Sequence, residues 1–263
     1  MDLSYWYFFI LALFGAVVAS ATGAGGGVVF VPAFNMLGLS PQSIIATSFA
    51  IQCFGMSAGA FAWFNYAKQP GLATEVPAWQ SYSRFILWFS VPAVIGVVAG
   101  QTIIDPGSPQ DVKALFKVFS MAFAVAILVT TAYIVKFQNR ALDPVAISPL
   151  IKVLFVVVGL IGGTITAWLS IGVGELIAVL LILMRYPVRM AVGVAASVSA
   201  VSVLVGVQKY LWFEPTIDTS VLLFAGPAAA IGGTIAKRVV AWFSPVQLKL
   251  FIASWILISA FAM

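Results

Sequence analysis

The sequence predicts an all-α polytopic membrane protein built from two inverted repeats, each with one re-entrant or broken helical segment and three transmembrane helices. The first observation behind this prediction is the composition. Apolar residues make up 62% of the 263-residue chain, charged residues make up 8%, and the mean hydropathy is +1.11. Charged residues account for about 25% of an average soluble protein. A soluble domain of this size cannot bury so much apolar surface, so the excess must face lipid.

The second observation is the division of the chain into long apolar segments. A helix that crosses a bilayer needs about 20 mostly apolar residues. Polar and turn-forming residues separate eight apolar segments of roughly that length or longer, at 5–38, 42–66, 83–103, 112–136, 150–185, 188–210, 217–240 and 245–262. We therefore expect a multi-pass helical protein.

Two of these segments, 5–38 and 150–185, are too long for a single crossing. A continuous helix over 5–38 would be about 50 Å long, against a hydrocarbon core of about 30 Å. Glycines interrupt both segments, in the runs 23–27 (Gly-Ala-Gly-Gly-Gly) and 171–174 (Ile-Gly-Val-Gly). After each interruption only about 11 residues remain before the next turn, which is too few to cross. We expect a re-entrant hairpin or broken helix in each half, with its tip at membrane depth.

The two halves of the chain are related by an internal repeat. A shift of 147 residues superimposes four glycine pairs, Gly15 on Gly162, Gly25 on Gly172, Gly27 on Gly174 and Gly59 on Gly206. Four coincidences at one offset, with the same order of segments, support a duplication. We expect two membrane repeats, an N-terminal one over 1–140 and a C-terminal one over 141–263, that form one integrated transmembrane domain.

The lysine and arginine residues predict the topology. If both long segments return to the side on which they began, one side of the membrane collects ten of these residues: Lys68, Arg84, Lys136, Arg140, Lys152, Arg185, Arg189, Lys237, Arg238 and Lys249. The other side has three, Lys113, Lys117 and Lys209. The positive-inside rule makes the first side cytoplasmic. Each half then crosses three times, so the second half is inverted relative to the first and both termini are periplasmic. We expect a bacterial inner (cytoplasmic) membrane as the location.

The two breaks define the candidate substrate site, because broken helices of inverted repeats meet near the bilayer midplane. The half-helices after the breaks start near Val28 and Glu175. Their N-termini present free N–H groups and a partial positive charge, which bind anions, and glycine lets an oxyanion approach the backbone. The expected substrate-binding residues are the break glycines with nearby hydroxyls and one amide: Thr22, Gly25, Gly26, Gly27, Thr47, Ser48, Gln52, Ser170, Gly172, Gly174, Ser197 and Ser199.

These residues also have structural interpretations. Serine and threonine in membrane helices often bond to their own backbone or to a neighbouring helix. An amide such as Gln52 is more costly to bury, which favours a functional or lumen-facing position. The pairs Gly55/Gly59 and Gly96/Gly100 have the spacing of close helix packing.

Glu175 is the one acidic residue placed at membrane depth, where an ionisable side chain indicates function. A carboxylate in the first turn of a helix is favourable, but it would repel an anionic substrate. A protonatable Glu175 would instead couple the substrate to protons, and we expect it to be the proton-coupling residue. The alternative is a structural cap, or an ion pair with Arg185 or Arg189.

Several classes of function and site are excluded by composition. The chain has no histidine and one cysteine, Cys53, which removes histidine-ligated metal sites, Ser-His catalysis, histidine proton relays and an intrachain disulfide. The net charge of +5 is modest and is no sign of nucleic-acid binding. We therefore expect no metal, no cofactor and no nucleic acid as partners.

Five short motifs carry a family resemblance: Gly-Ala-Gly-Gly-Gly-Val-Val-Phe-Val-Pro at 23–32, Ala-Thr-Ser at 46–48, Gly-Gly at 162–163, Ile-Gly-Val-Gly at 171–174 and Ala-Val-Gly at 191–193. In these motifs the sequence resembles the TauE/SafE sulfite exporter family over essentially its whole length. The resemblance implies a secondary transporter without a bound cofactor that exports sulfite, sulfoacetate or a related sulfur-containing anion. The chain departs from the family pattern at Val194-Ala195, where Thr-Ser is common.

Three classes of function remain open from the residues. A secondary anion exporter fits the duplication, the broken helices and the inward dipoles. The resemblance implies that its anion contains sulfur, and a protonatable Glu175 would link its transport to protons. An anion uptake transporter or channel, for thiosulfate or sulfite, has the same sequence features, because direction follows from coupling. A membrane-embedded enzyme lacks the expected acid–base or metal groups, so we expect no enzymatic activity. The expected partners are a small anion and the lipid bilayer, and a homo-oligomer stays open.

Overall fold

The structure is a computed structural model that describes residues 5–72, 76–137 and 144–242, and then 244, 246–247, 250, 253–254 and 256–258. This described part is helical and contains no strand. Its helices are α1 (Tyr7–Thr22), α2 (Gly27–Met36), α3 (Pro41–Ala67), the 3-10 helix η2 (Pro77–Ser81), α5 (Tyr82–Thr102), α6 (Pro109–Phe137), α7 (Pro149–Leu169), α8 (Val173–Leu183), α9 (Val188–Trp212) and α10 (Thr219–Trp242). The predicted all-α fold is confirmed.

Serine caps followed by proline set the start of two long helices. The Ser40 hydroxyl accepts a hydrogen bond from the Ser43 N–H at 3.3 Å, and Pro41 is the first residue of α3. Ser148 caps α7 in the same way, with Pro149 following it. A serine oxygen satisfies one of the free N–H groups of the first turn, and proline has no N–H to satisfy, so this pair fixes a helix start.

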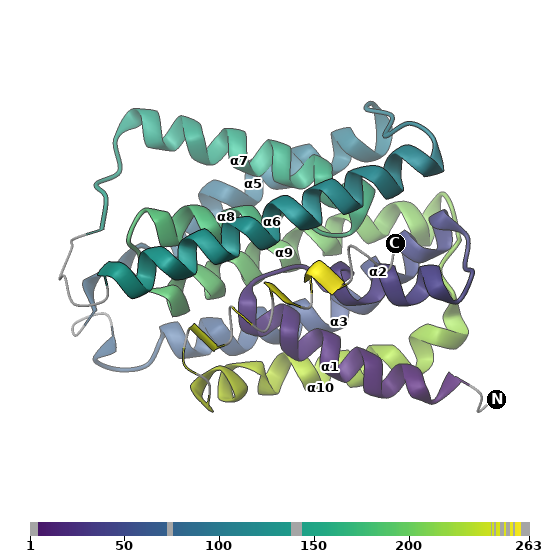
Figure 1. The fold of residues 1–263 in the computed structure, drawn as a ribbon, viewed down its shortest axis with the longest axis horizontal. Coiled ribbons are helices and arrows are strands. Elements are labelled where there is room, and N and C mark those ends of the chain that lie inside the picture. The colour runs from purple at the N-terminus through teal and green to yellow at the C-terminus, as the bar shows by residue number, and fades with distance from the viewer. Residues whose placement is uncertain are drawn as a thin grey trace.

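Both predicted breaks are present. The first separates α1 from α2 at residues 23–26, and the second separates α7 from α8 at residues 170–172. In Figure 1, α2 leads back towards the end of the molecule at which α1 began, and α8 leads back towards the end at which α7 began. The α1–α2 and α7–α8 pairs are therefore re-entrant hairpins in form.

Six helices in the described part are long and apolar enough to cross a membrane: α3, η2 with α5, α6, α7, α9 and α10. With 16, 10 and 11 residues, α1, α2 and α8 are shorter. Helix α7 has 21 residues and is by itself long enough to cross a membrane. We describe it as part of a hairpin because α8 leads the chain back. The crossing expected at 245–262 lies largely outside the described residues.

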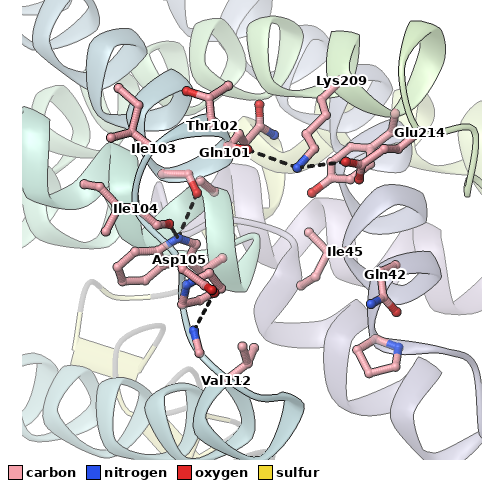
Figure 2. Close-up of a pocket in the computed structure, with 17 residues that line it drawn as sticks. Gln42, Ile45, Gln101, Thr102, Ile103, Ile104, Asp105, Val112, Lys209 and Glu214 are labelled. Carbon is pink, nitrogen blue, oxygen red and sulfur yellow. Dashed lines mark hydrogen bonds and ion pairs between the residues drawn. The ribbon is translucent and has the colours of Figure 1, made fainter.

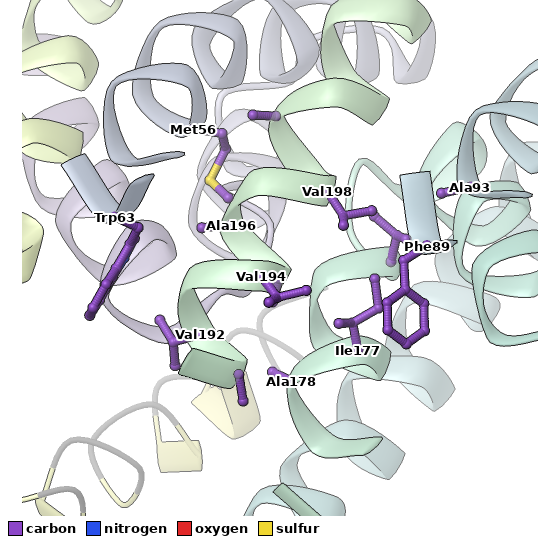
Figure 3. Close-up of a cluster of buried hydrophobic side chains, with 14 of the residues drawn as sticks. Met56, Trp63, Phe89, Ala93, Ile177, Ala178, Val192, Val194, Ala196 and Val198 are labelled. Carbon is purple, nitrogen blue, oxygen red and sulfur yellow. The ribbon is translucent and has the colours of Figure 1, made fainter. Parts of the chain in front are cut away.

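Helices α3 and α9 form the centre of the bundle. Of their most apolar windows, 61% and 83% are buried inside the protein. Figure 3 shows α9 in the core, with Met56 and Trp63 of α3 on one side and Phe89 of α5 and Ile177 of α8 on the other. Polar groups carried by α3 and α9 are thereby held away from lipid, which is a requirement for a substrate site at membrane depth.

Glycines bring the remaining long helices into close contact. Helix α1 packs along α10, and α5 packs along α7. Gly55 and Gly59 of α3 lie against Gly233 of α10, and Gly96 and Gly100 of α5 lie against α7. A Cβ at Gly233 or Gly96 would collide with a carbonyl oxygen of the facing helix. The packing interpretation of the two glycine pairs is confirmed.

The two ends of the bundle differ in charge. The end where α3 and α10 finish and α9 begins, at the left of Figure 1, has these described cations: Lys68, Arg84, Lys152, Arg185, Arg189, Lys237 and Arg238. We call it the basic end. The opposite end, called the acidic end, has Lys113, Lys117 and Lys209 together with the described acids Asp105, Asp111, Glu214 and Asp218.

Candidate substrate site at the two helix breaks

The first break directs two backbone N–H groups at side chains from elsewhere in the chain. Helix α1 stops at Gly23, which has a φ of 75° that glycine tolerates readily. The Gly25 N–H donates to Glu175 Oε1 at 2.7 Å, and the Gly26 N–H donates to Gln52 Oε1 at 2.8 Å. The N–H groups that the sequence assigns to a substrate anion are thus already bonded to a carboxylate and an amide.

The second break has a similar construction. Helix α7 stops at Ser170, a non-glycine residue with a φ of 59°, and Gly172 has a φ of 142°. The Gly172 N–H donates to Glu175 Oε2 at 2.7 Å. The Thr166 hydroxyl accepts from the Val173 N–H at 2.9 Å and donates to the Gly162 carbonyl at 2.8 Å.

Glu175 joins the two breaks. It is the third residue of α8 and completely buried, and each of its carboxylate oxygens accepts an N–H from a different break. Both oxygens act as acceptors here, a role that the ionised form performs most strongly because its hydrogen bonds are charge-assisted. The bond to Gly172 makes Glu175 a helix cap as well. The alternative ion-pair partners, Arg185 and Arg189, are exposed at the basic end.

Gln52 makes a second bridge between the breaks. Besides accepting from Gly26, its amide donates to the Ser170 carbonyl at 3.1 Å, to the Ser170 hydroxyl at 2.7 Å and to the Ser48 hydroxyl at 3.1 Å. Ser170 also donates to Ser48 at 2.9 Å. A buried amide whose donors and acceptor are all used holds its neighbours in one arrangement, since each lost bond would leave a polar atom unsatisfied.

Glycines allow the two breaks to touch. A Cβ at Gly27 would lie 2.5 Å from the Ser170 carbonyl oxygen, and a Cβ at Gly174 would collide with the Gly23 carbonyl oxygen and with Ser199 Oγ. These positions therefore require glycine because backbone meets backbone there.

Ser199 is the unsatisfied polar group of the site. It is 3% exposed, and its hydroxyl has no hydrogen-bond partner among the described residues. At the predicted repeat offset of 147, the position that corresponds to Gln52 is Ser199. Where Gln52 reaches across to the opposite break, the shorter Ser199 leaves its oxygen beside the first turn of α8 with nothing to bond.

Three of the predicted site residues do not join this cluster. The Thr47 hydroxyl accepts from the Asp218 N–H at 2.9 Å and so holds the connection before α10. The Ser197 hydroxyl donates to the Gly193 carbonyl at 2.8 Å and lies 3.0 Å from the Tyr82 hydroxyl. Thr22 caps the first break locally by accepting from the Ala24 N–H.

Two pockets lie near the two ends of α3. Pro41 and Ile45, near its start, line a pocket of about 380 Å³ at the acidic end, and Trp63 and Tyr66, near its finish, line one of about 200 Å³ at the basic end. Figure 2 shows the larger pocket, in which Lys209 bonds to the Gln101 carbonyl at 3.0 Å and to Glu214 at 3.4 Å. Ser48 and Gln52 lie between the two pockets along α3.

The comparison with protein families decides the identification. The family model described as sulfite exporter TauE/SafE matches residues 8–263, essentially the whole chain. The chain belongs to the TauE/SafE family. As a TauE/SafE protein whose described residues include six helices capable of crossing a membrane, it is a multi-pass membrane protein of a transporter family for sulfite and related anions. No curated protein and no solved structure matches the chain.

Sequence reasoning missed some residues of this TauE/SafE site. Thr166 stands one helical turn before Ser170, and its place beside a break was the available signal. Gly23 belongs to the first glycine run, but its role as the contact of Gly174 needs the folded chain. Within the described residues, no group of three or more histidine, cysteine, aspartate or glutamate side chains could hold a metal ion.

Proposed function

We propose that this protein exports a small sulfur-containing oxyanion, such as sulfite, sulfoacetate or a related sulfonate, from the cytoplasm, and that the transport is linked to protons. One observation carries the proposal: backbone N–H groups from both breaks converge on a single buried carboxylate. The protein thus holds a negative charge of its own where its glycine-rich helix starts would hold an anionic substrate.

The proposed mechanism is an exchange of acceptors. When Glu175 takes a proton, one of its oxygens becomes a hydroxyl, which is an uncharged and weaker acceptor, so a substrate oxygen can compete for one break N–H. The free Ser199 hydroxyl beside the first turn of α8 would donate to the same anion. Loss of the proton restores the carboxylate and expels the substrate by competition and repulsion.

Among the described residues, we find no other candidate for carrying the proton. Helices α6, α7 and α9 pack against α8, and the first break also contacts it. The titratable side chains that the structure describes on these three helices are Asp111, Lys113, Lys117, Lys152, Arg189, Lys209 and Tyr210. The charged groups among them are at the two ends of the bundle: Asp111, Lys113, Lys117 and Lys209 at the acidic end, and Lys152 and Arg189 at the basic end. A proton that moves with the substrate is therefore assigned to Glu175.

The proposal includes the inverted repeat, which reciprocal contacts support. At the offset of 147, Gly27 and Ser170 correspond to Gly174 and Gly23. Gly27 lies against Ser170, and Gly174 lies against Gly23. A two-fold relation produces such exchanged pairs. The helix packing shows the same exchange, because α1 of the first half packs on α10 of the second, and α7 of the second half packs on α5 of the first.

The proposal also assigns the orientation of the protein. The basic end faces the cytoplasm and the acidic end faces the periplasm of a bacterial inner membrane, by the positive-inside rule. Under this orientation the α1–α2 hairpin starts in the periplasm, the α7–α8 hairpin starts in the cytoplasm, and the two meet at Glu175.

Reconstitution tests the function. Purified protein in liposomes that contain a sulfite-sensitive dye should move sulfite at a rate that depends on an imposed pH gradient. Sulfite flux that ignores the pH gradient would favour a channel and contradict the proton-linked exporter. Flux by the protein alone would also exclude the enzyme interpretation.

A further inference from the structure

Resting on the proposed function, we propose that the pocket at the basic end is a second oxyanion site, which takes a sulfonate, sulfite or phosphate-type group before it reaches the breaks. The pocket lies between α3, α9 and α10 and is lined by Trp63, Tyr66, Gln69, Arg189, Lys237 and Arg238. Its volume of about 200 Å³ is well above the roughly 10–15 Å³ that a cavity needs to hold one water molecule. A small organosulfonate or one phosphate head group fits.

The three cations of this pocket are not neutralised by the described acids. Arg189 donates to the Tyr66 hydroxyl at 3.3 Å, and the ion pair found among the described residues, Lys209 with Glu214, is at the acidic end. That acidic-end pocket also contains Asp105. The basic pocket therefore attracts an anion through its net positive charge, whereas the lysine of the acidic-end pocket is neutralised by its ion pair.

Arg189 is placed against the preference of its own helix. It is the second residue of α9, a helix of 25 residues whose cap, Pro187, makes no side-chain hydrogen bond. The first turn of a helix carries a partial positive charge, so a cation there is unfavourable. An oxyanion in the pocket would interact favourably with both Arg189 and the free N–H groups of that turn.

The floor of the pocket is connected to the first break. The Trp63 indole N–H donates to the Ser20 carbonyl of α1 at 2.9 Å, and Ser20 stands one turn before Gly23. Along α3, Trp63 is about 16 Å from Gln52. The basic pocket therefore lies at the cytoplasmic end of the helix column that leads to the breaks, as a loading site for export requires.

Thermal unfolding in a neutral detergent tests the site, with a permanently ionised alkylsulfonate as the probe. The double variant Lys237→Gln/Arg238→Gln should bind the sulfonate roughly five- to tenfold more weakly than the wild type. The control Lys152→Gln, which removes an exposed cation of the same end outside the pocket, should bind as the wild type does. Gly26→Val, which blocks the break, should retain the binding at the basic pocket that is weakened in the double variant.

A lipid source for the same chemistry is distinguished in nanodiscs. If phosphatidylglycerol stabilises the wild type more than phosphatidylcholine does, and the double variant loses this difference, the occupant is a phospholipid head group. If the sulfonate binds in detergent, the occupant is the substrate. If neither ligand distinguishes the double variant from Lys152→Gln, the second site is refuted. Because these experiments measure binding and not transport, they test the second site even if the proposed transport function fails.

Discussion

The substitution Glu175→Gln tests the role of the buried carboxylate directly. Glu175 accepts two N–H donors at 2.7 Å each, one from Gly25 and one from Gly172. Glutamine has one acceptor oxygen, so its NH₂ group must oppose the second backbone donor. An unsatisfied buried donor costs about 1–3 kcal/mol, and the remaining bond loses its charge assistance. We expect the variant to be less stable than the wild type by about 2 kcal/mol without ligand.

Ligand should reverse part of this loss. A sulfonate offers acceptor oxygens to the orphaned N–H, and the repelling carboxylate is gone, so the sulfonate should raise the unfolding midpoint of Glu175→Gln more than that of the wild type. Wild-type affinity should improve as the pH falls, because protonation of Glu175 weakens its bond to one N–H. The affinity of the variant should depend less on pH.

The assay is thermal or denaturant unfolding in detergent, with and without a permanently ionised sulfonate, at several pH values. The matched control is Glu214→Gln, because this glutamate is 51% exposed in its ion pair with Lys209, and such pairs contribute about 0–1 kcal/mol. Equal stability of Glu175→Gln and Glu214→Gln, together with identical pH profiles for sulfonate binding by Glu175→Gln and the wild type, would refute the reasoning.

The remaining predictions concern the breaks, Ser199 and the topology. Gly26→Val and Gly172→Val should abolish sulfite flux in liposomes, because the first places atoms against Phe30 and Gln52 and the second strains a φ of 142°. The control Gly38→Ala, at a positive φ with open space around it, should transport normally. Normal flux in both valine variants would contradict the assignment. Ser199→Ala removes an unsatisfied buried hydroxyl, so stability should stay equal or rise by about 1 kcal/mol while sulfonate affinity falls roughly three- to tenfold. The control Ser202→Ala, another buried unpartnered serine, should share the stability effect without the affinity loss. On a Cys53→Ser background, a cysteine at residue 140 or 152 should react with an impermeant thiol reagent only from the cytoplasmic side, and labelling from the periplasm would overturn the orientation.

Local features of the sequence predicted the breaks because glycine runs act locally. The runs at 23–27 and 171–174 coincide with the observed breaks to within a residue or two. A helix start or stop depends on φ angles, caps and proline within one turn, all of which the sequence carries. The clustering of Gly25, Ser48, Gln52 and Ser170 followed from the expectation that the two breaks meet.

The partners of these residues depended on the folded chain. Glu175 bonds to Gly25 across 150 residues, and Gln52 bonds to Ser170 across 118. Which side chain faces which break is set by how α3, α8 and α9 cross, and periodicity within one helix does not determine that. Thr47 and Ser48 are neighbours on α3 and so point about 100° apart, which left only one of them able to face the breaks.

The most direct measurement of the central account is proton uptake on ligand binding. If Glu175 yields its backbone donors to the substrate, binding of a permanently ionised sulfonate to the wild type in weakly buffered solution should take up about one proton per anion. The Glu175→Gln variant should bind the same sulfonate with no proton uptake. Wild-type binding without a proton, or equal uptake by both proteins, would contradict the account.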